Sequence, residues 1–175
     1  TRWNNAFCLM AELGLRPTEV NKLIVKKDPT TKEFYWFCTY EKKGGGGTTE
    51  PRRIEPLPLL DRDGKEVKWN LIDRFRANLL PLPERVDGDA CKVYLQRREG
   101  WKQLKEMMKK KEGSNLVPYS FRHYYSLRGH IAGIDSGSMA SSMGHSIEAH
   151  HRAYPYSSKA STTNAFKQAR ERLTA

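Results

Sequence analysis

The sequence predicts a single α+β domain that is mostly α-helical and carries a small antiparallel β-sheet on one side. Its 175 residues match the size of one ordinary domain that can bury a core. Apolar residues recur at helical spacing in the first segment, and the last third of the chain is typical of helices with polar interruptions. Between these regions lies a stretch rich in aromatic residues and β-formers, next to a run of four glycines, which is typical of a hairpin.

The N-terminal region predicts two helices. The first, "NNAFCLMAELGL", has apolar residues at roughly helical spacing and meets a helix stop at Gly14. The second, "RPTEVNKLIV", has Pro17 in its first turn and an apolar face within residues 20–24. Arg16 therefore lies in the joint between the two predicted helices.

The hairpin is predicted from three consecutive pieces of sequence. The first is "KEFYWFCTYEKK", from Lys32 to Lys43. The glycines at 44–47 follow, and glycine tolerates almost any backbone geometry, so they suit a flexible tip. The stretch "RRIEPLPL", from Arg52 to Leu59, is the returning strand, which prolines end.

The remaining chain predicts helices joined by turns. A turn at "DRDGKE" precedes a short amphipathic helix over residues 67–80, and "PLPERVDGDA" is a loop. Residues 94–113 are predicted to form a charged helix that Gly100 weakens. Helical segments follow in "SFRHYYSLRGHIAGI", "SGSMASSMG" and "TTNAFKQARERL", the last of them capped by Thr162 or Thr163.

Composition favours a polyanionic partner. Lysine and arginine outnumber aspartate and glutamate by 31 to 20, which gives a formal net charge of +11. Nucleic acid suits this balance because Lys and Arg release its condensed counterions, although a merely soluble basic protein has the same composition. Cys8, Cys38 and Cys91 have no metal-ligand spacing and are expected to be free thiols in a reducing, cytoplasmic compartment. No signal peptide is visible, and the apolar runs are too short for a transmembrane helix.

Each candidate functional residue has an ordinary explanation when it is taken alone. Arg16 can be a surface or capping residue, and the two lysines before the glycine run can be solvated. Arg122, in "YSFRHYYSLRGH", can belong to a plain buried helix face. His145 can cap a helix, and Tyr154 can be a partly buried aromatic residue.

Their order and spacing point to a more specific assignment. "GLRPTEV", a lysine at a hairpin tip, "YSFRH" and "MGHSIEAHHRAY" together resemble the catalytic domain of the tyrosine recombinases, the family of phage integrases and chromosome-dimer resolvases. That family has Arg in a "GLRxxE" turn, Lys in a β-hairpin, an "HxxRH" box, an "LGH" box and a nucleophilic Tyr. Arg122 precedes His145 by 23 residues and His145 precedes Tyr154 by nine, as in the family. The resemblance spans residues 1–175 as one catalytic domain.

The resemblance implies roles for the two arginines. Arg16 and Arg122 match the family arginines that hold the non-bridging oxygens of the scissile phosphate, and Glu19 matches the acidic residue that supports the first turn. Planar guanidinium forks suit this task because they bind two oxygens at once. They would also stabilise the extra negative charge of a pentacoordinate phosphorane.

The resemblance also assigns the groups that transfer protons and attack phosphorus. Lys43 best matches the hairpin lysine that protonates the leaving 5′ oxygen. Lys42 is the alternative, because a slip of one residue turns a strand side chain to the other face. His145 would hydrogen-bond the phosphate, and Tyr154 would attack phosphorus and form a 3′-phosphotyrosyl link.

One position departs from the family pattern. Tyr119 stands three residues before Arg122, where the family most often has His. A neutral imidazole accepts a proton near pH 7, whereas a phenol with a pKa of about 10 does so poorly. We therefore expect activity with an altered pH dependence, Tyr119 still hydrogen-bonding a phosphate oxygen. His123 also fits the family pattern, but it is expected to point elsewhere and to be structural.

Several other polar residues are assigned to the surface or to DNA. Lys42, Arg52, Arg53 and Arg152 are predicted to contact DNA. In the stretch "MGHSIEAHHRAYPY", His150, His151 and Arg152 are expected to be surface or DNA-facing bystanders, and Tyr156 is a fallback nucleophile.

Other functions remain open from the sequence. Metal ligation is disfavoured, because His145, His150 and His151 are not four apart and no HExxH pattern accompanies them, so no metal or cofactor is expected. A type IB topoisomerase would use the same phosphotyrosine chemistry to relax supercoils. A non-catalytic DNA-binding relative would keep the basic groove without turnover.

The resemblance implies the partners as well. One partner is double-stranded DNA at recombination sites. The other is further copies of the chain, which in the family form a tetramer in which the final helix packs on a neighbouring protomer. The alternative is that this helix packs on its own domain. The family's N-terminal clamp domain is not recognised in this chain, so we expect weak, steeply salt-dependent binding. A phage or other mobile element in a bacterial cytoplasm is the expected source.

Overall fold

A computed structural model describes residues 1–43, 48–155 and 159–174. The predicted glycine tip at 44–47 and the fallback nucleophile Tyr156 lie outside the described residues. The elements, in chain order, are α1 (Arg2–Leu13), the 3-10 helix η1 (Pro17–Lys22), β1 (Leu23–Lys27), β2 (Phe34–Cys38), β3 (Arg52–Ile54), α2 (Leu71–Arg76), α3 (Gly88–Gln96), α4 (Glu99–Glu112), α5 (Ser120–Ile131), α6 (Ser136–Met143), α7 (Ile147–Ala153) and α8 (Lys159–Leu173).

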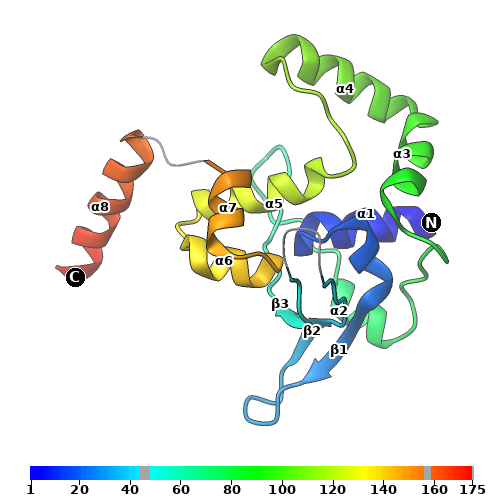
Figure 1. The fold of residues 1–175 in the computed structure, drawn as a ribbon, viewed down its shortest axis with the longest axis horizontal. Helices are drawn as coiled ribbons and strands as arrows, with labels where there is room; N and C mark the ends of the chain where they lie inside the picture. Colours follow the sequence, from blue (N-terminus) through cyan, green and yellow to red (C-terminus); the bar gives the residue numbers. More distant parts are fainter. Residues whose placement is uncertain (44–47, 156–158, 175) are drawn as a thin grey trace.

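The predicted fold class is confirmed. The strands form one antiparallel sheet in the order β1-β2-β3, and most of the described chain is helical. Figure 1 shows the strands together on one side of the helices, α5, α6 and α7 as a group, α4 projecting from the body and α8 apart from that group. Within the described ranges, no helix combines the length and the apolar character needed to cross a bilayer.

The N-terminal helix ends where the sequence predicts. Gly14 has a left-handed φ of 65°, and its N–H donates to the carbonyl of Met10. Glycine suits this position for a second reason, because an added Cβ would lie 2.3 Å from the ring of Tyr125 on α5. This close approach fixes the joint that contains Arg16 against α5.

The second predicted helix is wrong over its C-terminal half. Only the 3-10 turn η1 forms, and the chain then continues as strand β1. Ile24 and Val25 are β-branched, and Val25 pairs with Trp36 in the antiparallel ladder with β2. Pairing with the aromatic strand therefore overrides the helical spacing.

The main core lies between the sheet and α1. Trp36 and Ile54, which are paired across β2 and β3, are buried together with Leu9 and Leu13 of α1. A smaller buried cluster joins α5, α6 and the end of α7, and it contains Tyr125, Met139, Met143 and Tyr154. The candidate site lies where these two clusters meet.

The central predictions need three corrections. The helix predicted over 67–80 is confined to α2, because Asn70 takes a left-handed φ of 49° just before it. The helix predicted over 94–113 is two helices, which are separated at Arg97 and Arg98. The first of them begins inside the predicted loop, since the Asp87 carboxylate accepts a hydrogen bond from the N–H of Ala90 at 2.8 Å and caps α3.

The last helix also differs from its prediction. It begins at Lys159, so Thr162 and Thr163 lie inside the helix and do not cap it. Every α8 side chain whose burial is described is exposed, including Phe166 and Leu173. Most of the apolar surface of Phe166 and Leu173 is therefore exposed.

Candidate phosphate-binding site

A buried carboxylate organises the site. Arg16 is the residue before η1, and its backbone N–H donates to Glu19 Oε2 at 2.9 Å, which folds the glutamate back onto the turn. Glu19 Oε1 accepts hydrogen bonds from Arg16 Nη1 at 2.6 Å and from Arg52 Nη2 at 3.0 Å. Arg122 Nη1 lies 3.7 Å from Oε2. Burial opposes ionisation of Glu19, but the charges of Arg52, Arg122 and Arg16 outweigh it and lower its pKa.

The two predicted phosphate arginines lie together but differ in exposure. The Arg16 side chain is 22% exposed, whereas that of Arg122 is fully buried. Arg16 Nη2 donates to the carbonyl of Gly144 at 3.0 Å, and Arg122 donates to the carbonyls of Gly14 and Met143. Both guanidiniums are therefore anchored to the turn that precedes His145.

Gly144 keeps that turn close to the arginines. Its φ is 67°, and a Cβ there would lie 2.6 Å from Cζ of Arg52. Arg52 Nε donates to the carbonyl of Ser142 at 2.8 Å, so this side chain lies inside the cluster, although the sequence predicted it to face DNA. Arg53, the next residue on β3, is half exposed and pairs with Glu55 at 2.6 Å.

His145 follows directly and is held as a neutral imidazole. Its Nε2 contacts Nη2 of Arg122. Burial and the charges of Arg122 and Arg16 lower its pKa to about 3, so it carries no charge near pH 7. A neutral ring can hydrogen-bond a phosphate without adding to the positive charge of the cluster.

Tyr154 lies at the end of α7 among three imidazoles. Its ring centroid is 5.9 Å from that of His145, 5.3 Å from that of His123 and 4.9 Å from that of His150. Tyr154 is only 3% exposed. The candidate nucleophile is thus part of the smaller buried cluster.

Two expectations about the histidines are wrong. His150 is fully buried and is not a bystander, since its Nε2 lies 3.0 Å from Nε2 of His130. Burial, His130 and other nearby charges lower the pKa of His150 to about 4. His123 was expected to point away from the site, but its ring lies against both Tyr119 and Tyr154. His151 and Arg152 are exposed, as predicted.

Tyr119, the departure from the family pattern, lies beside both arginines. It precedes α5, and the Arg122 guanidinium lies 5.9 Å from its ring centre. Burial alone would lower the pKa of Arg16, but Glu19 and then Tyr119 raise it above its usual value. Tyr119 is therefore close to both arginines of the candidate site.

The hairpin register distinguishes the two candidate lysines. Lys42 and Thr49 exchange both backbone hydrogen bonds at 2.9 Å, so they are directly opposite each other. Thr49 is buried, and its hydroxyl donates to the carbonyl of Gly144 at 3.3 Å. Residues opposite each other in an antiparallel pair share a face. Lys42 is therefore directly opposite a residue that contacts the turn before His145.

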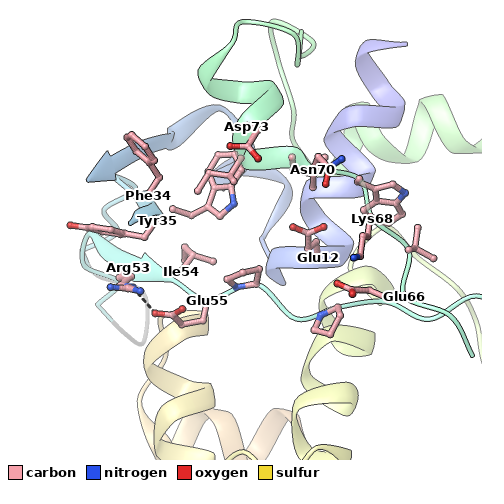
Figure 2. A pocket seen from close by; sticks show the side chains of 17 residues that line it. Glu12, Phe34, Tyr35, Arg53, Ile54, Glu55, Glu66, Lys68, Asn70 and Asp73 are labelled. Atoms are coloured by element: carbon pink, nitrogen blue, oxygen red, sulfur yellow. Dashed lines mark ion pairs between the residues drawn. The ribbon is translucent and has the colours of Figure 1, made fainter. Parts of the chain in front are cut away.

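A hollow in another part of the molecule is poorly suited to phosphate. It has a volume of about 590 Å³ and lies beside the sheet and α2. Figure 2 shows its carboxylates, Glu12, Glu55, Glu66 and Asp73, with the ion pair between Arg53 and Glu55. Burial raises the pKa of Glu12 to about 7, with Arg128 opposing the rise and Glu66 adding to it. The arginine cluster is therefore the better anion site.

The fold and the site together define the class of protein as a mostly helical α+β domain with an arginine-rich anion site. In this site one buried glutamate pairs with three arginines, and a tyrosine lies nearby among histidines. In the part of the chain that the structure describes, no group of three or more His, Cys, Asp or Glu residues is placed to hold a metal ion.

The comparisons with known proteins found similarity only among solved structures. No family model matches the chain, and no curated protein matches it. Among solved structures, the chain is similar to the Tn1549 transposon integrase (residues 82–397) in complex with circular intermediate DNA, with 17% identity, a TM-score of 0.49, and coverage of 94% of this chain and 58% of that chain. It is also similar to a variant of that integrase in complex with transposon right end DNA, with 18% identity, a TM-score of 0.49, and coverage of 98% and 58%. The chain thus spans 58% of the length of each of these two.

Proposed function

We propose that this chain is the catalytic domain of a site-specific DNA recombinase that cuts and rejoins double-stranded DNA through Tyr154. The observation that carries the proposal is the convergence of Arg16, Arg122 and His145, with the ring of Tyr154 5.9 Å from that of His145. These groups come from distant parts of the sequence, and they are the set that phosphoryl transfer to a tyrosine needs.

In the proposed reaction, Arg16 and Arg122 hold the non-bridging oxygens of the scissile phosphate. The phenol oxygen of Tyr154 attacks phosphorus, and its proton passes to a neutral imidazole, of which three surround the ring. The bond from phosphorus to the 5′ oxygen breaks, and a hairpin lysine protonates the leaving oxygen. The bridge between Lys42 and Thr49 supports Lys42 for this role over Lys43. Attack by another 5′ hydroxyl reverses the steps and rejoins DNA.

The proposal requires the site to open on DNA. Tyr154 is 3% exposed and Arg122 is fully buried, so phosphorus reaches neither of them without movement of the turn that carries Met143 and Gly144. The closed site supports one rival, a DNA-binding domain that does not cleave. The same experiment separates the two.

The experiment is covalent trapping. The chain is incubated with a pool of nicked duplexes of randomised central sequence, and adducts are separated by gel electrophoresis in SDS. Wild type is expected to form an adduct that Tyr154→Phe abolishes and that Tyr124→Phe, at an exposed position on α5, retains. Absence of an adduct with wild type favours the non-cleaving rival, and an adduct undiminished in Tyr154→Phe refutes the nucleophile. Relaxation of supercoiled plasmid without strand exchange would point to topoisomerase activity.

A further inference from the structure

A second hollow adjoins the arginine site and has no role in the reaction described above. Its volume is about 450 Å³, and its wall includes Arg16 and Tyr119 of the candidate site. The rest of the wall comes from η1, α3, α4 and the segment before α5, and it includes Lys92, Trp101 and Lys105. We call this hollow the α3–α4 groove.

The side chains of this groove follow from helical spacing. Lys92 and Gln96 are four residues apart on α3, and Trp101 and Lys105 are four apart on α4, so each helix turns one pair toward the groove. Trp101 is held in place by stacking on Phe121 of α5, with ring centroids 6.1 Å apart. The aromatic wall is therefore fixed to the helix that carries Arg122.

The chemistry of the groove selects a ligand with both an apolar face and negative charge. Arg16, Lys92 and Lys105 supply cations, and none of the described residues that line the groove is acidic. Trp101 supplies an aromatic surface, with Val117 and Pro118 beside it. The hollow of Figure 2 has the opposite character, since four carboxylates line it. DNA combines charged phosphates with flat bases and apolar sugar faces, and aromatic side chains stack on bases.

We propose that the α3–α4 groove binds the DNA nucleotide next to the phosphate at Arg16, with Lys92 and Lys105 on backbone phosphates and Trp101 against the sugar or base. The proposal rests on the proposed function only in placing a DNA phosphate at Arg16. It extends the DNA-binding surface to three residues that belong to none of the recognised motifs.

The test is the salt dependence of duplex binding. Fluorescence anisotropy with a labelled 30-base-pair duplex compares wild type, the double variant Lys92→Gln/Lys105→Gln, and the control Lys32→Gln/Lys65→Gln, which removes equal charge from exposed positions outside the groove. Loss of two phosphate contacts is expected to reduce the slope of log Kd against log salt by about 2. The control is expected to change the slope much less. Equal slopes for the two double variants would overturn the proposal.

Trp101 gives an independent readout. Trp101→Phe preserves the stacked packing on Phe121, and its melting temperature is compared with wild type to verify folding. Addition of duplex is expected to quench wild-type tryptophan fluorescence more than that of Trp101→Phe. Identical quenching would place DNA outside the groove.

The two proposals can fail separately. Covalent trapping with wild type tests the recombinase, and the salt slope of Lys92→Gln/Lys105→Gln tests the groove. A changed salt slope without any wild-type adduct would support DNA binding in the groove and refute the proposed recombinase activity. A wild-type adduct together with an unchanged salt slope in the double variant would support the recombinase activity and refute DNA binding in the groove.

Discussion

Replacing Glu19 with glutamine is expected to destabilise the domain by about 4 kcal/mol, because removal of one member of a buried ion pair typically costs 3–5 kcal/mol. Glu19 is fully buried and lies 2.6 Å from Arg16, 3.0 Å from Arg52 and 3.7 Å from Arg122. Glutamine keeps the shape and removes the charge. The fully buried guanidinium of Arg122 then loses its one ion-pair partner among the described residues.

Urea unfolding followed by tryptophan fluorescence measures the loss, and thermal unfolding should show a drop of roughly 10 °C for a domain of this size. Glu84→Gln, at an exposed position, is the matched control and is expected to stay within about 0.5 kcal/mol of wild type. A loss below about 1 kcal/mol in Glu19→Gln would refute the view that the carboxylate holds the arginines together.

The pH dependence tests the same reasoning with a definite sign. Burial opposes the charge of Glu19, but the three arginines lower its pKa below the ordinary 4.5. A lowered folded-state pKa gives stability that is present above 4.5 and is lost as pH falls through the folded value. The difference between wild type and Glu19→Gln should therefore be constant from pH 8 to 5 and shrink in more acidic solution. A difference that does not change with acid would assign the effect to shape instead of charge.

Two further predictions concern other positions. Burial raises the pKa of Glu12 to about 7, so its ionisation costs stability as pH rises from 4.5 through 7. The shift corresponds to about 3.4 kcal/mol, which solvent screening of this partly exposed carboxylate reduces to about 2 kcal/mol. Glu12→Gln should therefore stabilise the domain by about 2 kcal/mol at pH 8 and little at pH 4, measured by urea unfolding. Gly144→Ala should destabilise the domain by about 2 kcal/mol, because Gly144 has a φ of 67° and an added Cβ would lie 2.6 Å from Arg52. The control Gly100→Ala, in open space on α4, should stabilise the domain by about 0.5 kcal/mol. Equal melting temperatures for the two variants would contradict this prediction.

Much of the fold could be predicted because local signals decide it. Apolar spacing and the glycine stop define α1, and the aromatic stretch defines β2. The strand β1 could not be recognised from spacing, since its identity depends on pairing Val25 with Trp36, eleven residues further along. The start of α3 was locally encoded by Asp87, a capping residue that was assigned to a loop.

The sequence predicted which motif residues converge at the site, but it did not predict all the residues that hold them in place. Arg16, Glu19 and Arg122 converge as their spacing suggested. Arg52 was missed as a partner of Glu19, although alternation along a strand requires Arg52 and Arg53 to face opposite sides, so one of them turns inward. His150 carried a similar signal, because it stands four residues before Tyr154, one helical turn below it. The backbone bridge between Lys42 and Thr49 could not be predicted from sequence, because it depends on the register of the opposite strand.

The arrangement of donors links phosphate binding to access to Tyr154 in the proposed reaction. Arg16 Nη2 and Arg122 Nη2 already donate to the carbonyls of Gly144 and Met143, at the end of α6. Each Nη nitrogen has two N–H groups, and those of Arg122 Nη2 are already directed at the Met143 carbonyl and at His145 Nε2. A phosphate oxygen that binds Arg122 Nη2 must therefore replace one of these acceptors. The displaced turn leads into His145 and α7, which ends at Tyr154. In the proposed reaction, phosphate binding at Arg122 would therefore release the turn that leads into α7 and the candidate nucleophile Tyr154.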